Sequence, residues 1–292
     1  MNTVLKVTNL SKEYPNFTLE DISFQLPSGT IMGLIGENGA GKTTTLNAIL
    51  GLIHPDGGSV ALFGKALVDD PSGIKENIGV VMDGISFYDT LTPHKVGIIS
   101  KAAYKQWDDT LYTQYLDKFK LPLNQEIKTL SKGMKMKLNI AVALSHKPKL
   151  LILDEATSGL DPIVREDILE VFWDFVQDEN HSILMSSHIT SDLEKIADFI
   201  VFIHQGKIQF CEPKDALIDN YGVLRCGDST LESIDEEDII SIRRGTYQNE
   251  VLIRNRQLAA KKYKSAVVDK ASIDEIMLLY IKGEKRHEKF DY

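Results

Sequence analysis

The stretch Gly36-Glu37-Asn38-Gly39-Ala40-Gly41-Lys42-Thr43-Thr44 decides the fold of this 292-residue chain. An apolar run at residues 30–35 precedes it and predicts a short buried strand. Residues 44–52, with apolar positions at helical spacing, predict a helix that ends at Gly51. A G-x-x-x-x-G-K-[ST] pattern between a strand and a helix is typical of a loop that cradles phosphates.

Each part of this loop has a physical role in holding a nucleoside triphosphate. Its glycines let successive backbone N–H groups turn inward, and the helix N-terminus adds partial positive charge. Lys42 reaches the β- and γ-phosphates, and the Thr43 hydroxyl can ligate Mg²⁺. We expect nucleotide contacts from the whole loop: Gly36, Glu37, Asn38, Gly39, Ala40, Gly41, Lys42, Thr43 and Thr44.

Composition narrows the class of protein. Hydrophobic residues make up 43% and charged residues 26% of the chain, as is ordinary for a globular protein. The net charge of −9 argues against a nucleic-acid partner, which usually meets a basic face. Cys211 and Cys226 are too few for a disulfide framework. We find neither a signal peptide nor an apolar run long enough to cross a membrane, so another chain would have to do so.

The rest of the chain predicts an α/β fold with two additions. Alternating residues 4–9 and 18–26 predict strands, and helical periodicity dominates an insertion at about residues 84–145. After the insertion, strands and helices alternate again, with a predicted strand at 149–153, a helix at 162–175 and a strand at 182–186. Weaker signals (strands 239–242, 250–253 and 265–268, helix 272–281) predict a small α/β accessory domain over residues 214–292.

Two acidic residues and a histidine follow the later strands. A buried strand delivers Asp154 and Glu155 to the carboxyl edge of a parallel sheet, where ligands usually bind. Asp154 would hold Mg²⁺, and Glu155 would orient and deprotonate the attacking water. Acids also commonly follow strands simply to start helices, but the phosphate loop favours the catalytic interpretation. His188 follows the next strand and could donate a hydrogen bond to the transferring oxygens.

A second helix start can also bind an anion. Ser131 is well placed as the N-cap of a helix at 131–144, with Lys132 and Gly133 beside it. Two phosphate-binding helix ends in one chain suggest two halves of one site. If two copies face each other head to tail, each γ-phosphate lies between the Lys42 loop of one copy and Ser131–Gly133 of the other.

These motifs together resemble the ATP-binding subunits of ABC transporters over residues 1–213. The resemblance implies a P-loop NTPase core with an antiparallel β subdomain, and catalytic roles for Lys42, Glu155 and His188. It also implies that Tyr14, in a loop at 11–17, stacks on adenine; otherwise Tyr14 covers the sheet edge. In Ser158-Gly159-Leu160-Asp161 it places Asp161 at the dimer interface, near nucleotide. Lys132 and Met134 replace the family's usual glycine and glutamine.

One further departure lies after the strand at 78–82. The family usually has a metal-sensing glutamine there, whereas this chain has Asp83. We hypothesise that Asp83 contacts Mg²⁺ or its waters only in the closed dimer. By the same resemblance a groove receives a helix of the membrane subunit, although residues with this spacing are as often internal core. The groove residues would be Phe87, Tyr88, Leu91, Ile98 and Tyr104.

The resemblance implies an ATPase whose ATP-driven dimer closure powers export through a separate permease at the cytoplasmic face of a membrane. It extends to bacterial exporters of antimicrobial compounds or cytolytic peptides. The partner subunit could be a second copy or a homologue. Two alternatives remain: a soluble ABC ATPase without a permease, and a silent regulator that binds nucleotide without hydrolysing it. For the accessory domain we expect a role in dimer support, with regulation or no function as the alternatives.

Overall fold

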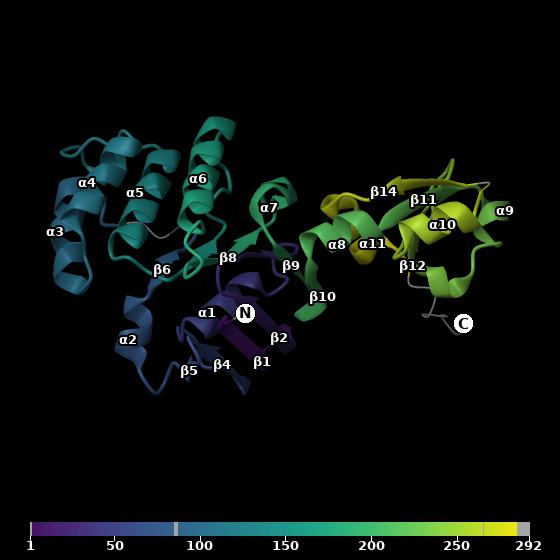
Figure 1. Ribbon diagram of the computed structural model, residues 1–292, viewed down its shortest axis with the longest axis horizontal. Helices are drawn as coiled ribbons and strands as arrows, with labels where there is room; N and C mark the ends of the chain where they lie inside the picture. The colour runs from purple at the N-terminus through teal and green to yellow at the C-terminus, as the bar shows by residue number, and fades with distance from the viewer. Residues whose placement is uncertain (1, 85–86, 265, 285–292) are drawn as a thin grey trace. The chain divides into compact units, whose positions relative to one another are not determined.

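The computed structural model describes residues 2–84, 87–264 and 266–284. The chain forms two compact units, Met1–Cys211 and Glu212–Tyr292, and each is described by itself (Figure 1). None of the helices in the described ranges has the length and hydrophobicity that a membrane span requires.

A six-stranded sheet, in the order β10-β9-β3-β8-β7-β6, forms the centre of the first unit. Strands β3, β8, β7 and β6 run parallel, as do β3 and β9. Parallel strands that are covered on both faces have continuous apolar sequences. This explains why the strands at residues 30–35, 149–153 and 182–186 could be predicted from the sequence. The strands are β3 (Ile31–Ile35), β6 (Ile78–Val81), β7 (Leu150–Asp154), β8 (Ser182–Ser187), β9 (Phe199–His204) and β10 (Lys207–Pro213).

The register of this sheet brings three chain segments to one edge. Ile35 pairs with Ser187, and Asp154 pairs with Ser186. Because parallel strands end together, the segments that follow β3, β7 and β8 leave the sheet side by side. These segments carry the phosphate loop, Glu155 and His188.

An antiparallel sheet, in the order β2-β1-β4-β5, forms a second layer. Its strands are β1 (Thr3–Tyr14), β2 (Phe17–Pro27), β4 (Gly57–Leu62) and β5 (Lys65–Ala66). The predicted loop at 11–17 is wrong over most of its length, because β1 continues to Tyr14, which pairs with Phe17. Asp56 supports this extension, accepting hydrogen bonds from Lys12 Nζ and the Glu13 N–H, both at 2.8 Å. The end of the hairpin is largely exposed. Its sequence therefore lacks the alternation of apolar and polar residues by which a half-buried strand is predicted.

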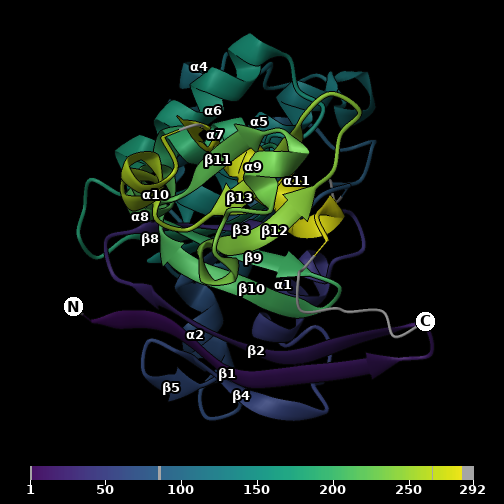
Figure 2. The ribbon, with the colours of Figure 1, turned by 90° about the vertical axis from the view of Figure 1, so that its right-hand side faces the viewer.

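The main hydrophobic core of this unit lies between the two sheets, with α1 (Lys42–Ile49) packed inside it (Figure 2). Leu5 and Leu19 from the antiparallel sheet, Leu46 from α1, and Leu34 and Ile152 from the parallel sheet are all 0% exposed. The helix that starts at the phosphate loop is therefore fixed in position by packing on both sides.

The predicted helical insertion is present between β6 and β7. Thr92 and Asp108 cap two of its helices by accepting hydrogen bonds from Lys95 N and Leu111 N. The helices here are α3 (Pro93–Ala103), α4 (Asp109–Lys118) and α5 (Lys132–Ser145). Elsewhere in the unit lie α2 (Pro71–Glu76), α6 (Pro162–Phe175) and α7 (Thr190–Ile196).

The second unit has a four-stranded antiparallel sheet in the order β12-β13-β11-β14. The sequence interpretation missed β11, although it lies inside the sheet, because its five residues include Gly222, Arg225 and Cys226 and show no clear alternation. Three short helices were also missed: α8 (Lys214–Asn220), α9 (Asp228–Leu231) and α10 (Arg256–Lys262). The remaining elements are β11 (Gly222–Cys226), β12 (Ile239–Arg243), β13 (Asn249–Ile253), β14 (Val267–Lys270) and α11 (Ile273–Lys282).

A buried histidine joins the helical insertion to α2. His146 follows α5 and is 0% exposed, and its Nδ1 lies 3.2 Å from the Glu76 carbonyl oxygen. Its ring stacks on Tyr104 with centroids 4.0 Å apart. Burial disfavours the charged imidazolium and so lowers the pKa of His146.

We predict that His146 makes the protein less stable in mild acid. Below about pH 6.5 the unfolded chain binds a proton at this position that the folded chain resists, so the free energy of unfolding falls as pH falls. Urea unfolding between pH 7.5 and 5.5 should show a shallower pH dependence for His146→Gln than for the wild type. The matched change at the exposed His54 should leave the slope unaltered; equal slopes in all three proteins would contradict the prediction.

Candidate functional site

The phosphate loop is shaped by close contacts at two glycines. A Cβ on Gly36 would lie 2.3 Å from the Ile203 carbonyl oxygen, so no other residue fits there. Gly41 has a φ of +114°, and a Cβ on it would lie 2.8 Å from the Leu19 side chain. The backbone therefore curls against both β9 and the antiparallel sheet, and it leads directly into α1.

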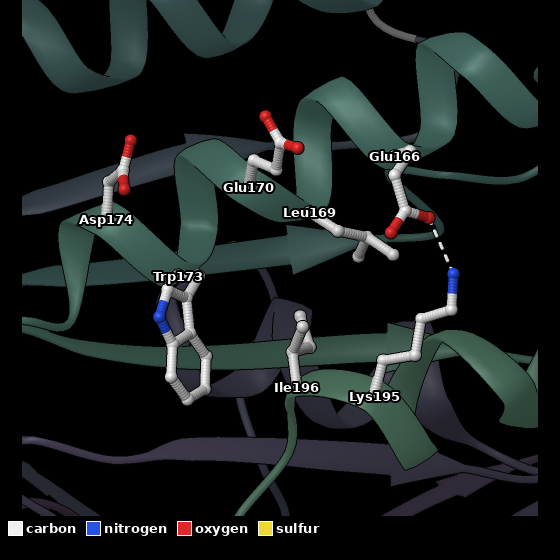
Figure 3. Close-up of a pocket in the computed structure, with 7 residues that line it drawn as sticks. All are labelled: Glu166, Leu169, Glu170, Trp173, Asp174, Lys195 and Ile196. Carbon is white, nitrogen blue, oxygen red and sulfur yellow. Dashed lines mark hydrogen bonds and ion pairs between the residues drawn. The ribbon is translucent and has the colours of Figure 1, made fainter.

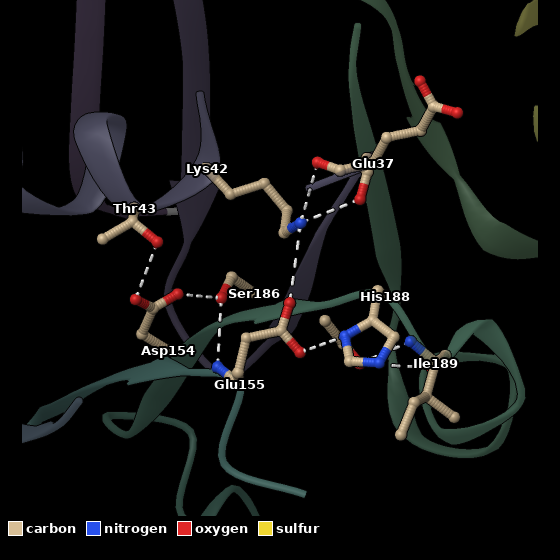
Figure 4. A network of polar contacts seen from close by, with 10 residues as sticks. Glu37, Lys42, Thr43, Asp154, Glu155, Ser186, His188 and Ile189 are labelled. Atoms are coloured by element: carbon tan, nitrogen blue, oxygen red, sulfur yellow. Dashed lines mark hydrogen bonds and ion pairs between the residues drawn. The ribbon is translucent and has the colours of Figure 1, made fainter. Parts of the chain in front are cut away.

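Lys42 lies inside this curl and is 6% exposed. Its Nζ donates hydrogen bonds to the carbonyl oxygens of Gly36, at 2.8 Å, and Glu37, at 3.2 Å. The same ammonium lies 3.5 Å from Glu155 Oε1 (Figure 4). A buried cation surrounded by oxygen atoms is a site that an anionic phosphate would complete.

Asp154 is held by two hydroxyl groups. Thr43 Oγ1 donates a hydrogen bond to Asp154 Oδ2 at 2.9 Å, and Ser186 Oγ donates one to Oδ1. Asp154 is 3% exposed and lies at the end of β7. The structure thus brings together Thr43 and Asp154, two of the three residues predicted to contact Mg²⁺; Asp83 is the third. Ser186 was missed by the sequence interpretation, because a serine that ends a buried strand carries no distinctive signal.

Glu155 and His188 are in direct contact, with His188 Nδ1 2.5 Å from Glu155 Oε2 (Figure 4). The Glu155 N–H lies 3.2 Å from both the carbonyl oxygen and the hydroxyl of Ser186, which fixes its backbone. Glu155 has a φ of +53°, in the left-handed region that is uncommon for a residue with a side chain. Lys42, Glu155 and His188, the predicted catalytic residues, therefore form one connected cluster.

The predicted second phosphate site lies at the start of α5. Ser131 Oγ accepts a hydrogen bond from Met134 N at 3.2 Å, so Ser131 is the N-cap. Within the described residues, no hydrogen bond or ion pair joins Ser131, Lys132 or Gly133 to the phosphate loop. Instead Lys132 Nζ would lie 2.8 Å from a Cβ on Gly159. Asp161 caps α6, accepting from Val164 N at 3.1 Å.

Tyr14 lies at the tip of the β1–β2 hairpin and is 39% exposed. Its ring centroid is 6.5 Å from that of Phe17, and Phe17 Cζ would lie 3.0 Å from a Cβ on Gly41. Phe17 therefore borders the phosphate loop, a contact that the sequence interpretation did not include, and Tyr14 lies beside the Phe17 ring. Asp83 is exposed and has no hydrogen bond or ion pair to any described residue, so its predicted metal contact stays a prediction.

The residues predicted to form the permease groove separate into two hollows. One, of about 550 Å³, is lined by Phe87, Tyr88, Leu91 and also by Ile99. The other, of about 290 Å³, is lined by Tyr104 together with residues of α1, α2 and β6. Ile98 is 59% exposed and lines neither hollow.

Comparison with known proteins identifies the same family. The family model "ABC transporter" matches residues 19–158. The chain is 36% identical over 217 residues to the bacitracin transport ATP-binding protein BcrA of Bacillus licheniformis, covering 71% of this chain and 69% of that protein. It is 33% identical over 265 residues to the linearmycin resistance ATP-binding protein LnrL of Bacillus subtilis (strain 168), covering 87% and 84%. A solved ATP-binding subunit of an ABC transporter superposes with a TM-score of 0.65 at 31% identity, covering 74% of this chain and 92% of that one.

We predict that Ser186→Ala weakens metal use without blocking nucleotide binding. The change removes one of the two hydroxyls that orient Asp154, and loss of such an outer partner typically lowers metal affinity by about tenfold or more. The Mg²⁺ concentration for half-maximal ATPase activity should rise by about that factor. Ser182→Ala, at the opposite end of the same strand, is the control and should leave the Mg²⁺ requirement unchanged.

Proposed function

This chain belongs to the family of ABC transporter ATP-binding subunits, an ATPase family, and on that premise we propose that it drives export through a separate membrane permease. The observation that carries the proposal is the cluster of Lys42, Asp154, Glu155 and His188 at one sheet edge. In the proposed roles, Lys42 would bind phosphate, Asp154 would bind the metal and Glu155 would act as the base for water, all within one site.

Nucleotide binding would replace contacts that the chain now makes with itself. Lys42 holds two carbonyl oxygens and lies near Glu155. The β- and γ-phosphates offer this ammonium a stronger anionic partner, and its transfer to them would release the Glu155 carboxylate. Glu155 could then accept a proton from the attacking water, with His188 orienting the carboxylate and the transferring oxygens.

The residues present fit Mg²⁺. This cation prefers oxygen ligands, keeps several waters, and is usually bound by one or two carboxylates together with substrate phosphates. Thr43 and Asp154 supply a hydroxyl and a carboxylate, already 2.9 Å apart. The metal would neutralise charge that develops on the phosphates. Asp83 is a further candidate, as a contact to the metal or its waters in the closed dimer.

A second ATPase subunit would complete the site. Ser131 and Lys132 form the exposed start of α5, with Gly133 buried behind them, and the partial positive charge of this helix end suits a γ-phosphate. Since no described contact links them to the phosphate loop of their own chain, we propose that they act on the nucleotide of the partner. Asp161 would lie at the same interface, and Tyr14 would stack on the adenine.

We predict that Glu155→Gln traps an ATP-bound dimer. The amide keeps the size of the side chain but cannot act as a general base, so ATP would bind and not be hydrolysed. Size-exclusion chromatography with ATP and Mg²⁺ should give a dimer of Glu155→Gln and a mainly monomeric Lys42→Ala/Glu155→Gln control. A monomer in both cases would contradict ATP-driven closure.

We further propose that the two hollows, one lined by Phe87, Tyr88 and Leu91 and the other by Tyr104 and β6, receive the membrane subunit. They are lined mainly by apolar side chains, and Tyr88 is 84% exposed beside the larger one. Large exposed apolar groups around a hollow are typical of protein contacts. This contact would place the chain at the cytoplasmic face of a membrane. The relatives named for bacitracin transport and linearmycin resistance favour antimicrobial compounds as the cargo.

Replacement of Leu91 by Asp should uncouple the ATPase from its permease. The charge would lie in the larger hollow and should lower co-purification with an integral membrane protein by about tenfold or more, as for a contact at the centre of an interface. The isolated ATPase rate should stay within about twofold of the wild type. Leu123→Asp, at another partly exposed leucine of the insertion, is the control. Failure of any membrane protein to co-purify with the wild type would favour the soluble alternative.

The second unit remains a candidate for dimer support. Its sheet carries a network in which Arg225 contacts Glu250, Asp269 and Glu275 within the same unit. These four charged groups are partnered within the unit, and we propose a structural role at the dimer for the unit as a whole.

A further inference from the structure

Two helices follow the sheet edge that carries Glu155 and His188, and an ion pair between a partly exposed arginine and a buried aspartate joins them. Helix α6 follows the turn at residues 158–161, and α7 follows His188. Arg165 Nη1 on α6 lies 3.7 Å from Asp192 Oδ1 on α7. Asp192 is 1% exposed, so its carboxylate is removed from water.

Stability does not explain this pair well. Burying two charges costs free energy that their attraction repays only when geometry and hydrogen bonding are good. Here the closest approach is long, and in the described part of the chain Arg165 Nε and Asp192 Oδ2 are buried without a hydrogen-bond partner. Apolar side chains of similar volume would join the two helices at least as well. The pair therefore calls for another role.

From Arg165, a series of contacts leads through the turn to Glu155. Arg165 Nη2 lies 3.5 Å from the carbonyl oxygen of Leu160. The Leu160 N–H donates to Thr157 O at 3.4 Å, and the Ser158 N–H donates to Glu155 O at 3.0 Å. The position of the guanidinium is thus linked to the backbone that aims Glu155.

From Asp192, a second series leads to His188. The Asp192 N–H donates to Ile189 O at 3.3 Å, and the Ile189 N–H donates to Ser187 Oγ at 2.9 Å. His188 lies between Ser187 and Ile189 in the sequence, and its Nδ1 contacts Glu155 Oε2. The two series therefore form a closed ring that begins and ends at Glu155, with the Arg165–Asp192 pair on its far side.

We infer that Arg165 and Asp192 are positioning residues for ATP hydrolysis: their pair fixes the turn at 158–161 relative to His188, so that Glu155 and His188 stay aligned. The inference rests on the proposed catalytic roles of Glu155 and His188. The turn also lies beside Lys132, which the proposed function assigns to the interface with a second subunit. If that subunit displaced the turn, the pair would pass the displacement on to His188.

A neighbouring ion pair provides a matched control. Glu166 Oε2 and Lys195 Nζ lie 2.5 Å apart and also join α6 to α7 (Figure 3). Both side chains are just over half exposed, and they border a shallow hollow of about 360 Å³ with Trp173. This pair links the same two helices, and in the described ranges no hydrogen bond or ion pair joins it to the turn at 158–161, so it tests helix packing alone.

The experiment compares steady-state ATPase kinetics and thermal unfolding in five variants. Asp192→Asn and Arg165→Gln should each lower kcat by about tenfold, with KM for ATP within about twofold of the wild type, as expected for misalignment rather than lost binding. The double variant Arg165→Gln/Asp192→Asn leaves no buried charge unpaired, so it should regain the thermal midpoint lost by Asp192→Asn while kcat stays low. Asp192→Glu keeps the carboxylate and should regain most of the rate. Glu166→Gln/Lys195→Gln should retain wild-type kcat.

Three results would overturn the positioning role. They are a double variant that regains kcat together with its stability, an exposed-pair control that loses as much kcat as Asp192→Asn, and wild-type kcat in a folded Asp192→Asn protein. Failure of the proposed function is separate, since it would appear as absent ATP hydrolysis in the wild type and no ATP-dependent dimer of Glu155→Gln.

Discussion

The buried ammonium of Lys42 is the constraint on which the rest of the site depends. A cation that is 6% exposed needs oxygen atoms around it, and the structure supplies two carbonyl groups and the Glu155 carboxylate. The glycines make this possible, because at Gly36 and Gly41 a side chain would collide with β9 or the antiparallel sheet. The packing of α1 between the two sheets then holds the lysine at the meeting point of the parallel strands.

The Glu155 carboxylate lies close to the Lys42 ammonium, which is the group that a bound phosphate would contact. One carboxylate oxygen faces Lys42 and the other contacts His188. Both oxygens of the Glu155 carboxylate therefore have a partner within the chain.

The sequence allowed the parallel sheet, the phosphate loop and the helical insertion to be predicted, because each has a local signal: buried apolar runs, glycine spacing, or helical periodicity. Contacts made in three dimensions were not predictable. Ser186 holds Asp154 across two strands, and Phe17 reaches Gly41 from a hairpin that looked like a loop. The second unit was predicted least well, since β11 is short, carries a charge and takes its place in the sheet from its neighbours. The groove residues were only partly placed, because Tyr104 stacks on His146 and faces a different hollow.

The left-handed backbone at Glu155 has a consequence for how this chain can vary. Left-handed geometry costs a residue with a β-carbon on the order of 1 kcal/mol, whereas glycine adopts it freely. A glycine at this position would relax the main chain but remove the carboxylate. At Glu155, selection for stability alone would therefore favour glycine, and only a requirement for the carboxylate would oppose that change.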